Sequence, residues 1–277
     1  MATYYVSATT GNDSNNGTAV GTAKATIGAG ENLATTAGDI VYIAPGTYRE
    51  QIVHGYSGTA ANRIYFIGDP DCEIFGSVVA PGVVRVTKTD ANNLPDTGAT
   101  TYRVIYSAGK DYITWKNVRV DGGSRPETAY NDSNISYGFA AQYESDNMEA
   151  INCMAQGFYY SFYRLNCRNC VALGIVGGFR DGLKLENCVA SSYYGFYYVA
   201  DAKNCVAIGG NYGFLYCDNV QNCTSYGSNI GFRTYNADVV TDCTTYNNAY
   251  AYYGGSSTST SVNGIISSET YITSIWW

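Results

Sequence analysis

The sequence predicts an all-β fold, a single-stranded parallel β-helix, from a short repeat and from composition. The repeat is an Asn-Cys pair, found at Asn152-Cys153, Asn169-Cys170, Asn187-Cys188, Asn204-Cys205 and Asn222-Cys223, with Asp242-Cys243 as a degenerate sixth copy. Its period of 17 to 20 residues is too short for two helices but holds short strands and bends. Each period is therefore predicted to form one coil, stacked about 4.8 Å from the next.

The composition supports this fold class. Only 14% of the residues are charged, whereas the chain contains 31 glycines and 28 tyrosines. Few charges with many Gly and Tyr favour β structure with tight turns over long helices. Hydrophobic residues make up 45% of the chain, which is enough to build a core.

Within each period, a Gly-Phe pair precedes the next Asn-Cys pair. The pattern Phe-x-Tyr, at Phe158/Tyr160, Phe196/Tyr198 and Phe214/Tyr216, predicts a strand with one face inward. The cysteine and the small residue two positions later are expected to face inward too. Each Asn is expected at a bend with a left-handed backbone, and the stacked amides are expected to hydrogen-bond from coil to coil.

The nine cysteines are predicted to be free, buried thiols. Their number is odd and six of them follow the repeat, which argues against a disulfide framework. Cys167 and Cys170 form one CxxC pair, but no second pair follows, so a zinc site is not expected. The only histidine, His54, is predicted to lie in a surface loop.

The N-terminal third differs from the repeat. The segments "YYVSATTGNDSNNGT", "AGDIVYIAPGTYRE" and "GTAANRIYFIGDPD" follow one another in the order found at the start of pectate-lyase-like β-helix proteins, which they resemble. The resemblance implies a single-stranded right-handed parallel β-helix whose open N-terminal end is capped by a short helix near residues 24–36. One continuous domain is expected, with cap and first coils in 1–100, regular coils in 101–250 and a C-terminal cap or interface in 251–277.

Charge and termini limit the partners and the location. The net charge of −7 argues against nucleic acid and anionic membranes, because both attract clustered Lys and Arg. The longest apolar runs fall short of the roughly 20 residues of a spanning helix. The N-terminus resembles no signal peptide, so synthesis in a cytoplasm is expected, with release as part of a virion as one route outward.

One vertical file of outward residues is the candidate binding site. It consists of Tyr159, Arg180, Tyr197, Leu215 and Arg233, because aromatic and Arg side chains at coil spacing suit stacking on sugar rings or a protein interface. Asp181 is the weak catalytic candidate, since it takes an inward position that Tyr holds in other coils. No metal-ligand cluster is evident, so no cofactor is expected, although the resemblance leaves calcium open.

These features favour a non-enzymatic role, as a phage fibre, tail-spike-like or capsid-decorating protein. Self-association as a homotrimer, other virion proteins and a polysaccharide are the expected partners. The alternative is a polysaccharide lyase or glycoside hydrolase of the pectate-lyase-like superfamily, since many proteins of that superfamily cleave or bind polysaccharides. Fold by itself does not decide between them.

Overall fold

The computed structural model describes residues 1–87, 101–122, 135–143, 147–233, 239–253 and 260–265. It divides into two compact units, residues 1–157 and 158–277, which are described separately. In both units nearly all regular structure is β, and the strands pair in parallel with strands of the neighbouring coil. The predicted parallel β-helix fold is therefore confirmed.

In the first unit, three columns of strands form the coil walls. One column runs β1 (Thr3–Val6), β2 (Ile40–Ile43), β5 (Ile64–Gly68), β8 (Ile113–Lys116) and β11 (Glu149–Ile151). The second runs β3 (Gly46–Arg49), β6 (Val84–Thr87), β9 (Arg119–Asp121) and β12 (Met154–Gln156). The third, in a separate sheet, contains β4 (Ile52–Val53), β7 (Thr101–Tyr106) and β10 (Ile135–Ala140).

The predicted cap helix is present but shorter than expected. Helix α1 spans Ile27–Glu31 and packs against β1, β2 and β4, and two 3-10 turns lie at Val20–Thr22 and Gly76–Val78. Thr26 caps its N-terminus by accepting a hydrogen bond from the Ala29 N–H. Glycine at position 30 lets the helix lie close to the sheet, because a Cβ there would come within 2.6 Å of the Val6 side chain.

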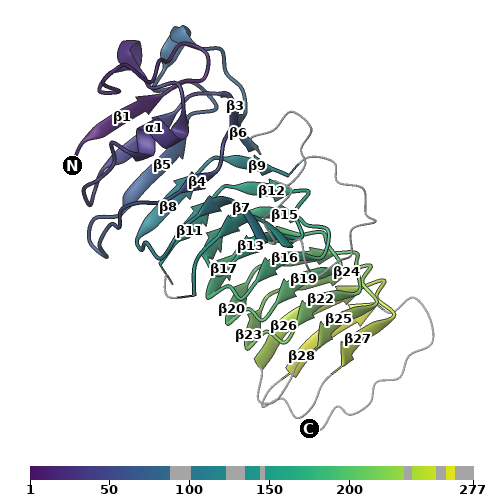
Figure 1. Cartoon of the computed structure of the whole chain (residues 1–277). Coiled ribbons are helices and arrows are strands. Elements are labelled where there is room, and N and C mark those ends of the chain that lie inside the picture. Colours follow the sequence, from purple (N-terminus) through teal and green to yellow (C-terminus); the bar gives the residue numbers. More distant parts are fainter. Residues whose placement is uncertain (88–100, 123–134, 144–146, 234–238, 254–259, 266–277) are drawn as a thin grey trace. The chain divides into compact units, whose positions relative to one another are not determined.

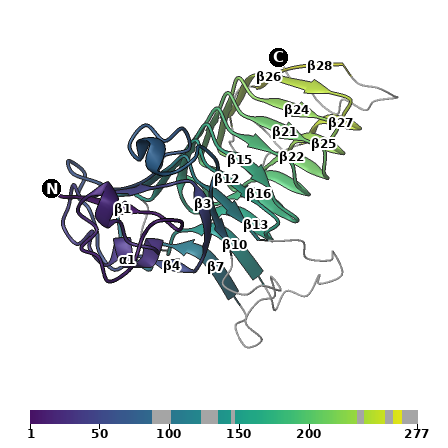
Figure 2. The ribbon, with the colours of Figure 1, turned by 90° about the horizontal axis from the view of Figure 1, so that it is seen from above.

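In the second unit, the coils are regular. The first sheet contains β14 (Asn166–Arg168), β15 (Val171–Leu173), β17 (Lys184–Glu186), β18 (Val189–Ala190), β20 (Asp201–Lys203), β21 (Val206–Ile208), β23 (Asn219–Gln221), β24 (Thr224–Tyr226), β26 (Val239–Tyr246) and β28 (Thr260–Ile265). The other sheet contains β13 (Tyr160–Tyr163), β16 (Gly177–Arg180), β19 (Tyr194–Tyr197), β22 (Tyr212–Leu215), β25 (Ile230–Arg233) and β27 (Tyr250–Tyr253). Figure 1 shows these strands as successive parallel arrows, and Figure 2 separates β21 and β24 from β22 and β25 as two layers.

The core of the second unit is a continuous stack of phenylalanine rings. Phe162, Phe179, Phe196, Phe214 and Phe232 stack in order, with ring centroids 4.6 to 5.1 Å apart and nearly parallel planes. All five are at most 1% exposed. This stack repeats at the coil spacing, so each ring fills the space between its two neighbours.

Each Asn of the repeat turns the chain between two strands. Asn187, Asn204 and Asn222 have φ near +50°. At each of these bends the strict alternation of buried and exposed side chains is interrupted by two successive exposed residues. In the coil at Asn187, Leu185 and Cys188 are buried whereas Glu186 and Asn187 are both exposed. The left-handed bend thus sets the register of the small residues, such as Ala190, that face the core.

Within the described residues, no helix is long and apolar enough to cross a membrane. Most of the C-terminal segment predicted to be a cap or an interface, residues 254–259 and 266–277, lies outside the described residues.

Candidate functional site: a tyrosine–arginine face

The outer side of the second sheet of residues 158–253 gathers aromatic and Arg side chains. We call it the tyrosine–arginine face and define it by Tyr160, Tyr163, Arg180, Tyr194, Tyr197, Tyr198, Tyr212, Tyr216, Arg233 and Tyr253. These residues occupy the first or last position of a strand, or the position just after it. Strand pairing places like positions of successive coils beside each other, as for Arg180 and Tyr197.

A close approach of backbones explains how these coils expose tyrosine while burying phenylalanine. In four strands of this sheet, β16, β19, β22 and β25, the second residue is glycine, as at Gly195 and Gly213. A Cβ on Gly195 would lie 2.6 Å from the Gly213 carbonyl oxygen and 3.0 Å from the Ala207 Cβ. Glycine therefore lets the strand lean toward the core, so that Phe196 enters the stack and Tyr197 emerges on the outside.

Two arginines each lie among three tyrosine rings. The Arg180 guanidinium carbon is 4.6, 5.4 and 5.8 Å from the ring centroids of Tyr160, Tyr197 and Tyr163. Its Nη1 also donates a hydrogen bond to the Tyr160 hydroxyl. Cation–π attraction and this hydrogen bond hold the guanidinium flat against the face.

The same arrangement recurs three coils away. The Arg233 guanidinium carbon is 5.3 to 5.5 Å from the rings of Tyr212, Tyr216 and Tyr253. Its Nη1 donates to the Tyr212 hydroxyl at 2.8 Å. Two equivalent cationic groups therefore lie on one face, separated by about three coil spacings, or roughly 14 Å.

Tyrosines fill the space between the two arginines. Tyr194 stacks on Tyr197 and on Tyr212, with centroids 5.2 and 5.7 Å apart and planes within 24°. Tyr197 and Tyr198 lie 4.4 Å apart, and Tyr198 is half-exposed. Burial, followed by a hydrogen bond to Tyr198, raises the pKa of Tyr197 to about 12, so its hydroxyl stays protonated at neutral pH.

The structure changes the membership of the predicted binding file. Arg180, Tyr197, Leu215 and Arg233 occupy one register position, but Tyr159 does not share it. The partner of Arg180 is Tyr163, because Phe162 rather than Phe158 pairs with Phe179. Leu215 stands in the file but is only 4% exposed. The binding role of the file stays a prediction.

The predicted inward position of Asp181 is wrong. As expected, Asp181 occupies the position that Tyr198 and Tyr216 hold in other coils, directly after the strand. All three residues have φ near +53°, so the chain bends there, and Asp181 is half-buried at the edge of the face. Its Oδ2 lies 3.5 Å from Arg180 Nε. Burial raises the pKa of the Asp181 carboxyl, although the guanidiniums of Arg180 and Arg164 act in the opposite direction.

The residues predicted to form the structural ladder lie at the bends. Asn152, Asn169, Asn187, Asn204, Asn222 and Asp242 all have a left-handed backbone, and so does Asn117, which the sequence did not single out. Asn152 Nδ2 donates to Asn117 Oδ1 at 3.2 Å, a coil-to-coil bond of the expected kind. The side chains of Asn187, Asn204 and Asn222 are exposed, and their backbone N–H groups donate to the next coil.

All nine cysteines are free and buried. Cys153, Cys170, Cys188, Cys205, Cys223 and Cys243 each follow a left-handed residue and point into the core. Their thiols find carbonyl acceptors, as in Cys205 Sγ to Lys203 O at 3.3 Å.

His54 is buried, which contradicts the predicted surface position. It is 3% exposed, and its Nε2 accepts a hydrogen bond from Trp115 Nε1 at 3.0 Å. Glu31 Oε1, at the end of the cap helix, lies 3.8 Å from His54 Nδ1 and accepts from the Gly55 N–H at 2.7 Å. The polar loop sequence around His54 gave no sign of Trp115, which comes 61 residues later.

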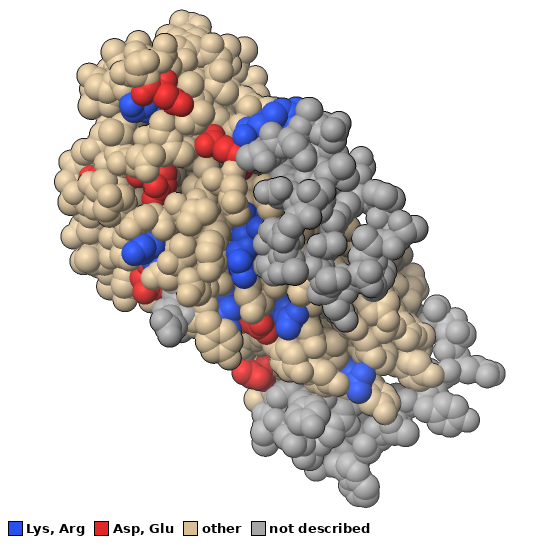
Figure 3. All heavy atoms as spheres, in the orientation of Figure 1, with Lys and Arg blue, Asp and Glu red and all other residues tan. Residues whose placement is uncertain are grey.

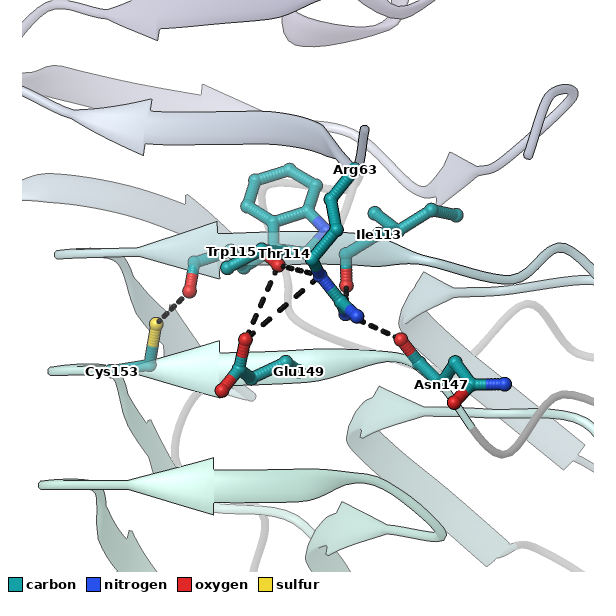
Figure 4. Close-up of polar contacts among 7 residues, drawn as sticks. All are labelled: Arg63, Ile113, Thr114, Trp115, Asn147, Glu149 and Cys153. Atoms are coloured by element: carbon teal, nitrogen blue, oxygen red, sulfur yellow. Dashed lines mark hydrogen bonds and ion pairs between the residues drawn. The ribbon is translucent and has the colours of Figure 1, made fainter. Parts of the chain in front are cut away.

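Arg63 joins three successive coils of the first unit, as Figure 4 shows. Its guanidinium donates to Thr114 Oγ1, to the Ile113 carbonyl and to the Asn147 carbonyl. Glu149 Oε2 lies 3.9 Å from Arg63 Nε and is only 20% exposed, like Arg63. Because Nε and Nη2 of Arg63 donate to Thr114 and to two backbone carbonyls, this cluster holds the coils together.

Charged groups are scattered over the surface. On the side shown in Figure 3, blue and red atoms form small separate groups among uncharged residues. Among the residues that the structure describes, no group of three or more His, Cys, Asp or Glu is placed to hold a metal ion. The role of calcium stays untested.

Comparisons with known proteins identify relatives by structure alone. The sequence matches no known protein family, and no curated protein matches it. A rhamnogalacturonan lyase has a similar structure, with a TM-score of 0.61 and 16% identity over 98% of this chain and 90% of that one. A GH136 lacto-N-biosidase from Eubacterium ramulus gives a TM-score of 0.55 at 12% identity, over 96% of this chain and 55% of that chain.

At such low identity the likeness shows the fold. The parallel pairing of strands from coil to coil agrees with it. The chain therefore has the right-handed parallel β-helix fold that its resemblance to the pectate-lyase-like superfamily implied.

Proposed function

We propose that this protein binds a polysaccharide along the tyrosine–arginine face. The observation that carries the proposal is the pair of arginines, each among three tyrosine rings, with a tyrosine stack between them. Partly exposed tyrosines in a row offer apolar ring edges to sugar rings, and the hydroxyl and guanidinium groups supply hydrogen-bond donors. The two similar structures are a rhamnogalacturonan lyase and a lacto-N-biosidase, which adds support.

The proposal is tested by affinity electrophoresis in gels that contain single polysaccharides, neutral and acidic. Wild-type protein is expected to be retarded by at least one polymer. Tyr194→Ala together with Tyr197→Ala should abolish the retardation, because both rings stack in the middle of the face. Tyr226→Ala is the matched control, since Tyr226 is 48% exposed and belongs to the other sheet. Retardation that survives the double substitution would contradict the proposal.

A second candidate function, depolymerisation, is favoured by the position of Asp181. Its carboxyl lies beside Arg180 at the edge of the face, and burial raises its pKa, as a general acid requires. On this hypothesis Asp181→Asn abolishes turnover but leaves polymer binding intact. New reducing ends or unsaturated ends are measured on each polymer that retards the protein. Turnover that persists in Asp181→Asn would exclude Asp181 as the acid.

The virion role and the homotrimer expected from the sequence remain predictions. The comparisons give the virion role no support and favour the glycan-active alternative. Mass photometry of the purified chain separates a monomer from a trimer.

A further inference from the structure

Two arginines of the first unit lie side by side at the same position of adjacent coils. Arg85 on β6 pairs in register with Arg119 on β9, so their backbones are about 4.8 Å apart. Like charges placed directly opposite each other in a sheet are destabilising. An anion placed between the two guanidiniums would offset this repulsion.

The carboxylate of Asp121 compensates only one of the two charges. Its Oδ2 lies 4.0 Å from Arg85 Nε and 3.7 Å from Arg119 Nη2, which is within ion-pair range but beyond a hydrogen bond. The same oxygen already accepts a hydrogen bond from Gln156 Nε2 at 3.1 Å. Among the described residues no other ion pair joins either arginine, so within this part of the chain two positive charges face one carboxylate.

The guanidinium donors are also incompletely used. The Nε–H of Arg119 is buried and has no hydrogen-bond acceptor among the described residues. The side chains of Arg85 and Arg119 are 42% and 29% exposed, so solvent-borne ligands reach them. A buried donor without an acceptor is costly and adds to the strain of the like-charge pair, whereas an anion from solvent would meet the exposed parts of the two side chains.

We propose that Arg85 and Arg119 form an oxoanion-binding site, which Asp121 partly occupies as an internal competitor. The ligand is a sulfate, phosphate or carboxylate group that accepts hydrogen bonds from both guanidiniums, the geometry for which Arg is best suited. The site belongs to the first unit and shares no residue with the tyrosine–arginine face. It therefore stands whether or not that face binds a glycan.

Isothermal titration with sodium sulfate, at an ionic strength held constant with sodium chloride, tests this site. Wild-type protein is expected to bind sulfate at a single saturable site. Arg85→Gln and Arg119→Gln should each weaken binding about tenfold or more, since each removes charge-assisted hydrogen bonds. Lys203→Gln, which removes an exposed charge from the second unit, should change nothing.

Asp121→Asn separates a binding site from a purely structural ion pair. If Asp121 competes with the ligand, the substitution should tighten sulfate binding about tenfold, because it removes a neighbouring negative charge. If the three residues only stabilise the fold, the substitution lowers the melting temperature and sulfate never binds. Absent sulfate binding, binding that survives both Arg substitutions, or weaker binding by Asp121→Asn would each overturn the proposal.

A sulfated oligosaccharide and a uronic-acid oligosaccharide identify the source of the anion. If either oligosaccharide binds more tightly than sulfate, and if Arg119→Gln abolishes that binding, the site takes an anion carried on a glycan. Equal or weaker binding of both assigns it to a free anion. Arg85→Gln serves as the readout if Arg119→Gln fails to fold, because Arg85 is the more exposed of the two.

Discussion

The two units build the same kind of coil by different means. In the second unit register partners are 17 to 20 residues apart, as for Glu186 with Lys203 and Gln221 with Thr241, and equivalent positions hold similar residues. In the first unit partners are separated by up to 53 residues, as for Ile52 with Ile105. Regular coils are held by stacks of identical side chains, whereas irregular coils combine a buried apolar core with polar contacts that are each made once.

Polar contacts of the first unit are each made once. Glu50 accepts the Ile27 and Gly28 N–H groups at the start of the cap helix, and Asp69 accepts from Ile74 and Phe75 in a turn. Adjacent coils do not repeat these hydrogen bonds, so the loss of one of them is not compensated by an equivalent contact. In a stack, a lost ring leaves two partners in place. The comparison therefore predicts where single substitutions hurt, and by which mechanism.

The largest effect is expected in the middle of the phenylalanine stack. Phe196→Ala should lower the free energy of unfolding by about 3–5 kcal/mol, because it opens a cavity between Phe179 and Phe214. Urea unfolding followed by circular dichroism measures the loss. Tyr226→Ala, an exposed ring of the same unit, is the control. A loss below 1 kcal/mol would mean that the stack closes over the gap.

The next largest effect is expected at Arg63. Arg63→Met keeps the apolar stem but leaves the Ile113 and Asn147 carbonyls without their charged donor, and should cost about 2 kcal/mol. Lys203→Met is the matched control, because Lys203 is exposed and its loss should cost little. Equal losses in the two variants would refute the idea that single contacts hold the irregular coils.

The Asn bends are of two kinds: the Asn152 side chain bonds to Asn117 of the adjacent coil, whereas the Asn204 side chain is exposed. The two kinds should respond differently to substitution. Asn204→Ala should cost about 1 kcal/mol, since alanine tolerates the left-handed backbone poorly. Asn204→Gly should cost less, because glycine adopts this conformation freely. Asn152→Ala should cost about 1 kcal/mol more than Asn204→Ala, since it also removes the hydrogen bond to Asn117. Unfolding in urea ranks the three variants, and equal costs for both alanine variants would remove the distinction.

The smallest effect is expected at Asp181 and depends on pH. Its pKa is raised in the folded protein, so the folded state binds the proton more tightly than the unfolded chain does. Ionised Asp181 therefore costs stability at neutral pH, and the cost disappears as the pH falls below the ordinary value of 3.8. Asp181→Asn should raise the melting temperature at pH 7 and leave it unchanged at pH 3. A lower melting temperature at pH 7 would show that the pairing with Arg180 dominates.

The sequence predicts the fold well because each copy of the repeat corresponds to one coil. Period, bends and buried cysteines all follow from spacing and residue type. The prediction for Tyr159 failed because the Gly-Phe pair of that coil, Gly157-Phe158, lies four residues before Phe162, the ring that joins the stack and that follows Ser161. Counting back from the next Asn finds the correct ring, since Phe179, Phe196 and Phe214 all precede their Asn by eight residues and Phe162 by seven.

Contacts between distant segments escape such reasoning. The burial of His54 depends on Trp115, and the register of Arg85 with Arg119 depends on how many residues each coil of the first unit contains. Irregular coils leave no period from which to count. The tyrosine–arginine face was found only in part, because the tyrosines at the first strand position, such as Tyr194 and Tyr212, lie outside the file considered.

The left-handed bend after each strand has a consequence for how this gene can change. A segment such as 187–203 begins on one bend and stops just before the next, where the chain has returned to the same position one coil further on. Tandem duplication or deletion of such a segment joins equivalent backbone conformations and leaves every other contact in register. Unequal recombination can thus lengthen or shorten the second unit in whole coils, and with it the number of tyrosines presented in a row.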